Sequence, residues 1–280
     1  MRYPSQKIER IKALRRRGFT LGEIVRDTRL PKSTVFHHIK NIIKSKQLTA
    51  RIVQARYFQL ARTSRRGKSF KSYPHLEPTE WSPIFVNLVA HILFDGQIAR
   101  CSVIYNNRSE ALINLFISEM DECIGVSDYK FLKKPDDVLL VSYHHVEITT
   151  FLKQKAVELL SYVSDASTDE KLAFLKAFFD DEGNVSFTST HRLVRGYQHS
   201  VPILELIQKL LADFGIASRI QPKFFEICIS RKADILRFAD LINFSEGVCV
   251  NGMRSNSVWK ESLEKREILR RLIKSYRLSA

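Results

Sequence analysis

The chain has 280 residues, of which 44% are hydrophobic and 27% are charged. These proportions are those of a folded protein with a core, and they exclude general disorder and low-complexity sequence. Lys and Arg number 45 against 30 Asp and Glu, which gives a net charge of +15. A polyanion is therefore the first partner to expect.

The cysteines and the apolar stretches limit where the protein works. Four scattered cysteines form no C-x-x-C pair, so neither a disulfide framework nor a zinc site is indicated. No stretch approaches the roughly 18 uninterrupted apolar residues of a membrane span, and the N-terminal sequence lacks an apolar signal region. We therefore expect a cytoplasmic protein with no membrane partner.

The excess charge lies at one end of the chain. Residues 1–75 contain 20 Lys or Arg and three acids, a net charge of +17, whereas the remaining residues contain 25 basic and 27 acidic residues, a net of −2. A composition break of this size predicts at least two functional modules.

Three short helices are predicted in residues 1–47. Apolar residues recur at helical spacing before Gly18, which acts as a helix stop. The capping box Thr20-x-x-Glu23 begins the second helix, and Pro31 opens the third. The apolar positions are Ile8, Ile11 and Leu14 in the first helix, Ile24 and Val25 in the second, and Val35, Ile39 and Ile42 in the third.

A tight turn before the third helix is typical of a helix-turn-helix. The string GFTLGEIVRDTRLPKSTVFHHIKN resembles the small DNA-binding domains of resolvases and of many endonuclease fusions. The resemblance implies that the third helix enters the major groove. The predicted DNA-binding side chains there are Lys32, Ser33, Thr34, His37, His38 and Asn41. A protein-interaction module with a solvated basic face is the alternative.

The rest of the chain contains an internal repeat. LVAHILFDG at 88–96 and LKAFFDDEG at 175–183 are both apolar helical segments with a small third residue, and both end on an acid followed by Gly. The acids Asp95 and Glu182 are 87 residues apart, and so are Phe151 and Phe238 in later matching segments. Each half is predicted as helix, hairpin, helix, strands and helix, which makes a tandemly duplicated α+β unit.

This pair of motifs resembles the signature helices of the LAGLIDADG proteins, best known as homing endonucleases, in their single-chain form. The resemblance covers about residues 82–255. It implies a monomer with an internal pseudo-two-fold axis, whose two αββαββα units form a saddle on double-stranded DNA. The predicted domains are the helix-turn-helix at 1–47, a basic helix and linker at 48–80, repeats at 81–164 and 165–255, and a basic C-terminal helix at 256–280.

The two motif helices predict a metal site. Small residues at Ala90 and Ala177 allow the helices to cross closely, which brings Asp95 and Glu182 together at their C-terminal ends. Two carboxylates beside the negative ends of two helix dipoles repel each other unless a cation neutralises them, and oxygen ligands with open positions suit Mg²⁺. We therefore predict Asp95 and Glu182 as metal ligands and catalytic acids.

Other candidates follow from the strands and turns of the repeat. Polar residues alternate with core residues after the second motif, and after the first motif the corresponding face is poorly polar, with Gln97, Ala99, Cys101 and Val103. The family often places a basic residue near its metals. Lys232 is the predicted catalytic basic residue, which would polarise water or phosphate, and His144 and His145 lie at the matched turn of the first half. The predicted DNA contacts of the second half are Asn184, Ser186, Thr188 and Arg231.

Two further polar residues of the motifs receive structural roles. His91 is interpreted as a packing histidine and Asp180 as an anchoring acid. The predicted function is a Mg²⁺-dependent, site-specific DNA endonuclease of the homing type. A non-cleaving transcriptional regulator with a LAGLIDADG-like fold is the alternative, favoured by the near-neutral repeats, and an RNA intron maturase is a further one.

Overall fold

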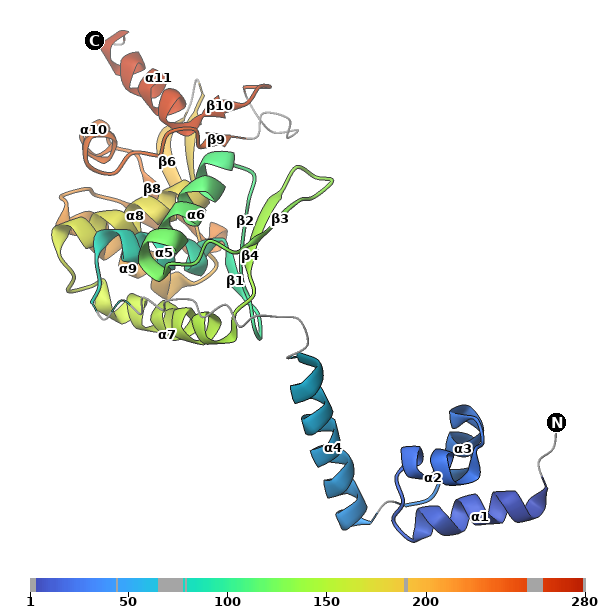
Figure 1. The fold of residues 1–280 in the computed structure, drawn as a ribbon. Helices are drawn as coiled ribbons and strands as arrows, with labels where there is room; N and C mark the ends of the chain where they lie inside the picture. Colours follow the sequence, from blue (N-terminus) through green and yellow to red (C-terminus); the bar gives the residue numbers. More distant parts are fainter. Residues whose placement is uncertain are drawn as a thin grey trace. The chain divides into compact units, whose positions relative to one another are not determined.

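The computed structural model describes residues 4–43, 45–64, 78, 80–188, 191–250 and 259–278. The chain divides into two compact units, Met1–Ser72 and Tyr73–Ala280 (Figure 1). Residues 65–77 of the predicted basic helix and linker, residues 251–255 of the predicted second repeat and residues 256–258 of the predicted C-terminal helix lie outside the described residues. None of the helices that the structure describes has the length and apolar character of a membrane span.

The first unit is helical, as predicted. Its helices are α1 (Ser5–Arg16), α2 (Leu21–Thr28), α3 (Lys32–Ile39) and α4 (Lys46–Ser64). The predicted capping box is present, since the Glu23 amide donates to the Thr20 hydroxyl and the Glu23 carboxylate accepts from the Thr20 amide. The turn between α2 and α3 is closed by Arg29 in the left-handed conformation. A small core unites the first three helices, formed by Ile11, Ile24, Leu30, Val35 and Ile39.

The third helix is shorter than its apolar spacing suggested. It ends at Ile39, so that Ile42, which the pattern placed inside it, follows the helix and packs only partly against the core. Asn41 consequently lies in the turn after the helix rather than on it. The apolar spacing continued past the point where the chain leaves the helix, because Ile42 still reaches the core from the turn.

The second unit contains two copies of one αββαββα arrangement. The first copy is α5 (Pro83–Phe94), β1 (Gly96–Ile98), β2 (Val103–Asn107), α6 (Glu110–Ile124), β3 (Lys130–Lys133), β4 (Leu139–Tyr143) and α7 (Val146–Tyr162). The second copy is α8 (Thr168–Glu182), β5 (Gly183–Phe187), β6 (Arg192–Tyr197), α9 (Val201–Asp213), β7 (Arg219–Gln221), β8 (Glu226–Ile229) and α10 (Lys232–Leu241), with a single 3-10 turn between β7 and β8.

Each copy forms a four-stranded antiparallel sheet with the same strand order. The orders are β1-β2-β4-β3 and β5-β6-β8-β7. The first hairpins also match in register, because Gly96 pairs with Tyr105 and Gly183 pairs with Gly196. Residues of the two halves can therefore be equated position by position. The predicted α+β class and the tandem duplication are confirmed.

The two motif helices, α5 and α8, lie at the centre of this unit and make its most extensive contact (Figure 1). Ala90 and Ala177 are fully buried, and the ring of Phe94 lies 5.2 Å, centroid to centroid, from that of Phe178. Each helix ends on an acid followed by a glycine that begins a strand. A Cβ on Gly183 would overlap the backbone of Phe179, so glycine is required there for the chain to turn directly from helix to strand.

Enlarging a small residue at this crossing is expected to be costly. Ala177→Leu should lower the free energy of unfolding by about 1–3 kcal/mol, because a close-packed interface cannot admit the added atoms without displacing side chains. Denaturant unfolding of the full chain measures the change. Ala233→Leu, at an exposed position of α10, is the matched control. Equal stability of the two variants would contradict a tight crossing at Ala177.

The C-terminal segment packs on the second repeat. A short strand, β10 (Leu263–Glu264), pairs with β9 (Cys249–Val250), and α11 (Lys265–Leu278) follows. The basic C-terminal helix was expected over residues 256–280, and the observed helix begins at Lys265. Its apolar face is buried in the core through Ile268, Leu269 and Leu272.

Candidate active site

A cavity of about 850 Å³ opens where the two motif helices end. Asp95 from α5 and Glu182 from α8 both line it, so the structure brings the two predicted acids into one cavity. The strands on either side supply polar and basic groups to its wall. These include Asn106, Asn107 and Arg108 from the first half, Asn184, Ser186, Thr188 and Arg195 from the second, and Trp259 and Lys265 from the C-terminal segment.

Asp95 caps the C-terminal end of α5 and is held by one hydrogen bond. The Asn107 amide donates to its Oδ2 at 2.8 Å. Burial and the negative charge of Asp181 raise the pKa of Asp95 to about 7, against the opposing effect of Lys265, His91 and the Asn107 hydrogen bond. The carboxyl group therefore titrates near neutral pH rather than near pH 4.

Glu182 is the last residue of α8 and is more weakly compensated. Burial, followed by repulsion from Asp95 and Asp181, raises the pKa of Glu182 to about 8, and Lys265 acts in the opposite direction. The charge of Asp95 therefore acts on the titration of Glu182. Two carboxyl groups with raised pKa values in one cavity mark a candidate for cation binding or proton transfer.

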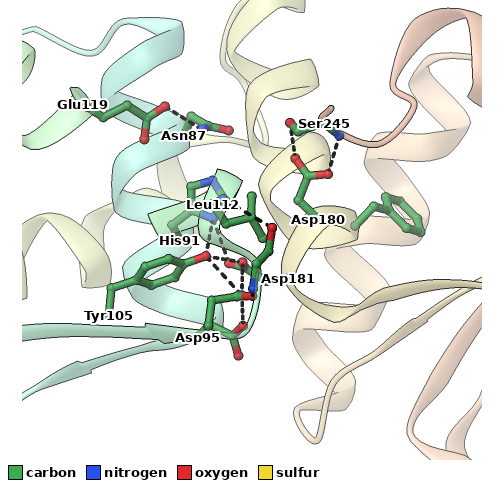
Figure 2. A network of polar contacts seen from close by, with 12 residues as sticks. Asn87, His91, Asp95, Tyr105, Leu112, Glu119, Asp180, Asp181 and Ser245 are labelled. Atoms are coloured by element: carbon green, nitrogen blue, oxygen red, sulfur yellow. Dashed lines mark hydrogen bonds and ion pairs between the residues drawn. The ribbon is translucent and has the colours of Figure 1, made fainter. Parts of the chain in front are cut away.

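A third acid of the motif, Asp181, is the centre of a buried polar network (Figure 2). Its side chain is fully buried, and its Oδ2 lies 2.8 Å from His91 Nδ1 across the crossing of α5 and α8. The Tyr105 hydroxyl donates to Asp181 Oδ1 at 2.5 Å. Burial lowers the pKa of His91, but Asp181, together with the charges of Glu119 and Asp180, outweighs burial and raises the pKa to about 9. A protonated His91 therefore neutralises Asp181 at physiological pH.

Two more contacts surround this network (Figure 2). Asn87, one helical turn before His91, donates to Glu119 Oε1 of α6 at 2.6 Å, and burial raises the pKa of Glu119 to about 7. Asp180 accepts hydrogen bonds from the amide and the hydroxyl of Ser245. Asp180 thus anchors the segment after α10, and His91 is a paired, packed histidine, as the sequence analysis expected for both.

Lys265 is a buried cation whose charge lowers the pKa of both cavity acids. It is 8% exposed, and its Nζ donates to the Asp180 carbonyl at 2.6 Å, at the negative end of α8. Burial lowers the pKa of Lys265, whereas the surrounding carboxylates, including Asp95 and Glu182, oppose that effect. The side chain both caps the helix and supplies positive charge to the cavity.

Removing this cation is expected to shift the titration of the acids. Lys265→Met should raise the pKa of Asp95 and Glu182 further, because its charge lowers both. Protons then compete with a divalent cation for the carboxyl groups up to a higher pH. The pH above which Mg²⁺ raises the melting temperature should therefore increase by roughly one unit. Thermal unfolding with and without Mg²⁺ from pH 6 to pH 9 measures this.

Lys176→Met is the matched control for that experiment. Lys176 lies on α8 and, like Lys265, donates to a backbone carbonyl, that of Ile242, but it is not among the groups that shift the pKa of Asp95 or Glu182. An unchanged pH threshold in Lys265→Met, or an equal shift in both variants, would show that Lys265 does not compensate the acids.

The structure separates the other predicted site residues into two groups. Asn184, Ser186 and Thr188 all line the cavity. Arg231 and Lys232 do not line it, and Lys232 Nζ lies 5.5 Å from the ring centroid of Tyr276 in α11. The geometry therefore brings Lys265, rather than Lys232, to the acids.

The matched turn of the first half is also engaged elsewhere. His144 contacts the Ser142 hydroxyl, and His145 caps α7. The expectation of one strand with Gln97 and Val103 on a common face is wrong. β1 ends at Ile98, the chain turns through residues 99–102, and Val103 begins β2 as a buried residue.

The predicted DNA-binding residues of the first unit lie on or beside α3. Lys32, Ser33, His37 and Asn41 are exposed, and Thr34 and His38 are partly exposed. The opposite face of α3 is buried through Val35 and Ile39. The exposed side is therefore polar and basic, except for Phe36, which is 54% exposed.

Sequence reasoning missed three residues of the site. Asn107 reaches Asp95 through the register of the first sheet, and Lys265 reaches the end of α8 from the C-terminal segment. No local sequence pattern reveals either contact. Asp181 could have been found, because the repeat offset equates it with Phe94 and equates its partner His91 with Phe178. A polar pair opposite an apolar pair at equivalent positions of one helix crossing is a signal of its own.

Comparisons with known proteins found the following similarities. Residues 169–243, from the start of α8 to just beyond α10, match the family model of the LAGLIDADG-like domain. Variants of the homing endonuclease I-DmoI match with 17% identity and a TM-score of 0.47, over 61% of this chain and 92% of theirs. Full-length DUF199/WhiA from Thermatoga maritima matches with 16% identity and a TM-score of 0.46, over 72% of this chain and 64% of its own. No curated protein matches the sequence.

The family match covers the second repeat, and the first repeat has the same order of helices and strands. The resemblance predicted from the paired motifs is thereby confirmed, while the N-terminal helix-turn-helix lies outside the match. Residues 169–243 of this chain are therefore similar to the LAGLIDADG-like domain family.

Proposed function

We propose that the chain is a site-specific double-strand DNA endonuclease of the homing type that hydrolyses phosphodiester bonds with Mg²⁺. The observation that carries the proposal is the acid pair. One carboxyl group from each half, Asp95 and Glu182, lines the same cavity, and burial together with the charge of Asp181 raises the pKa of both, while Asp95 also raises that of Glu182. Packing alone gives no reason to keep two acids that destabilise each other in one cavity.

The donor set fits a hard divalent cation. Within the described ranges no three His, Cys, Asp or Glu side chains are arranged as a closed metal site. Mg²⁺ is commonly bound by one or two carboxylates, with waters and substrate phosphates completing its shell, and Asp95 and Glu182 supply that number. When bound there, the cation would supply Lewis-acid activation of the phosphodiester and of water.

The chain's own residues then have separate tasks. Asn107 orients the carboxylate of Asp95 through its amide. Lys265 lowers the cost of holding two carboxylates together. Arg108 and Arg195 line the cavity wall, each paired with an acid at 3.4 Å, and can exchange these weak pairs for DNA phosphates.

The first unit supplies affinity in this proposal. Its net charge of +17 and the exposed polar side of α3 suit contacts to phosphates and to base edges. Residues 76–280, which contain the repeats, carry a net charge of −2, so they contribute less long-range attraction to DNA. We infer that the first unit anchors the protein on DNA and that the repeats cut.

The same charge distribution favours one competing function, a DNA-binding regulator that does not cut. A nuclease domain that holds a long polyanion usually benefits from positive charge, and residues 76–280 have a net charge of −2. The acid pair supports the enzyme, because a regulator needs no cation site.

Cleavage of selected DNA tests the proposal. Duplexes that bind the full chain are selected from a random library in Ca²⁺ and then transferred to Mg²⁺ or Mn²⁺. We expect double-strand breaks at one position of the selected duplexes, and none in EDTA. Tight, specific binding with intact DNA in both Mg²⁺ and Mn²⁺ would establish the regulator instead.

A further inference from the structure

The two sides of the central helix crossing differ in chemistry. The repeat offset equates His91 with Phe178 and Phe94 with Asp181. Each pair that meets across the crossing therefore has an equivalent pair on the other side of it. On one side His91 and Asp181 form a buried ion pair at 2.8 Å. On the other side Phe94 and Phe178 meet edge to face, with centroids 5.2 Å apart. A pseudo-symmetric crossing thus has one polar and one apolar side.

The neighbouring strands follow the same division. Sheet register equates Tyr105 of β2 with Gly196 of β6. Tyr105 extends its hydroxyl to Asp181, whereas a Cβ on Gly196 would overlap the ring of Phe178. The first half therefore combines the smaller helix residue His91 with the large strand residue Tyr105. The second half combines the larger Phe178 with a glycine. The polar contacts therefore gather beside β2 of the first half, although Asp181 comes from the second half.

This polar side reaches one acid and not the other. The Asn107 amide donates to Asp95 Oδ2 at 2.8 Å and lies 3.4 Å from both the Tyr105 hydroxyl and Asp181 Oδ1. Among the residues that the structure describes, none donates a hydrogen bond to the Glu182 carboxylate. Asp95 is therefore tied to the buried ion pair through Asn107, whereas Glu182 has no such support.

The counterpart of Asn107 isolates what is special to the first half. Sheet register equates Asn107 with Gln198, two residues beyond the Tyr105 and Gly196 pair. Both side chains accept a hydrogen bond from the amide that opens the next helix, Ser109 for Asn107 and Ser200 for Gln198. Only Asn107 also donates to a cavity acid. The turn-closing role is thus shared, and the contact to the acid is not.

We propose that Asn107, Tyr105, Asp181 and His91 form a positioning network for Asp95 alone, which makes the two DNA strands react at unequal rates. The inference rests on the proposed nuclease function. A duplex has local two-fold symmetry, so a pseudo-symmetric site presents one acid to each strand. Holding a ligand side chain in place before binding is worth about 2- to 13-fold in affinity per ordered side chain. The strand facing Asp95 is cut first, by about that factor.

Strand-resolved cleavage tests the network. A selected duplex with a different label on each strand is incubated with the full chain and Mg²⁺ under single-turnover conditions. Wild type is expected to cut one strand about 2- to 13-fold faster. Asn107→Leu should bring the two rates together by slowing the faster strand, and Gln198→Leu should leave their ratio unchanged. A merely structural role would slow both strands alike.

A second readout needs no cleavage. Mn²⁺ is titrated into the free full chain by calorimetry, and thermal unfolding verifies that each variant is folded. Asn107→Leu should weaken the Mn²⁺ affinity about 2- to 13-fold, and Gln198→Leu should not. If Asn107→Leu fails to fold, Tyr105→Phe, which removes one partner of the network, is expected to change the affinity in the same direction.

The outcomes separate this inference from the proposed function. Absence of cleavage by wild type together with selective weakening of Mn²⁺ binding in Asn107→Leu would overturn the nuclease but keep the positioning network. Cleavage with equal strand rates in wild type, or with the same ratio in wild type and Asn107→Leu, would overturn the network. Equal effects of Asn107→Leu and Gln198→Leu on Mn²⁺ binding would overturn it as well.

Discussion

Asp95→Asn and Glu182→Gln are each expected to reduce DNA cleavage by more than about 100-fold. Mutation of a group that only hydrogen-bonds to a metal ligand already lowers metal affinity or activity by about 10- to 100-fold. DNA affinity should stay within a few-fold of wild type, since the proposed anchor lies in the first unit. Cleavage and binding of the same labelled duplex measure both effects. Glu205→Gln, at an exposed position of α9, is the matched control. Loss of binding in parallel with cleavage would contradict separate roles.

The same variants should become more stable in the absence of metal. The pKa of Asp95 is about 7 and that of Glu182 about 8, against about 4 for both in an unfolded chain. The folded state therefore binds more protons between pH 4 and pH 8, and wild-type stability falls as pH rises through that range. In EDTA at pH 9 the neutral variants should melt at higher temperature than wild type, with little difference at pH 5. A lower melting temperature at pH 9 would contradict repulsion between the acids.

Deletion of residues 1–75 is expected to weaken DNA binding by more than about 100-fold at moderate salt and to flatten its salt dependence. Each phosphate contact contributes about 0.9 to the slope of log affinity against log salt, and this segment holds the entire excess of positive charge. Fluorescence anisotropy across a salt series measures the slope. An unchanged affinity and slope after the deletion would show that the repeats bind DNA by themselves.

A point variant refines that measurement in the full chain. Lys32→Gln, at the exposed start of α3, should reduce the slope of log affinity against log salt by about 0.9, the contribution of one phosphate contact. Lys153→Gln removes the same charge from an exposed position of α7 and should leave the slope unchanged. Equal slopes for the two variants would argue against α3 as the DNA-facing element.

The sequence predicts the fold well where periodicity and repetition agree. The capping box at Thr20, the helix start after Pro31 and the paired motifs ending in Asp95 and Glu182 all appear in the structure. Two copies of a motif constrain each other, which is why the tandem α+β arrangement could be inferred before any contact was known. The length of β1 could not, because its early end depends on a turn at residues 99–102 that carries no Gly or Pro.

The candidate site was predictable only in part. The two acids follow from local motifs, but the groups that set their charge come from distant segments. Lys265 returns to the end of α8 from the C-terminal segment, and Asn107 reaches Asp95 only through the register of β1 on β2. Asp181 is hidden in a run of three acids, of which one anchors a loop, one pairs with His91 and one, Glu182, receives no side-chain hydrogen bond from the part of the chain that the structure describes.

The central claim is that Asp95 and Glu182 together hold a divalent cation, and thermal unfolding in Mn²⁺ tests it without a known DNA target. At pH 8, Mn²⁺ should raise the melting temperature of wild type in a concentration-dependent way, because a ligand that binds only the folded state stabilises it. The double variant Asp95→Asn, Glu182→Gln should show no such rise. An equal rise in wild type and in the double variant would contradict the claim.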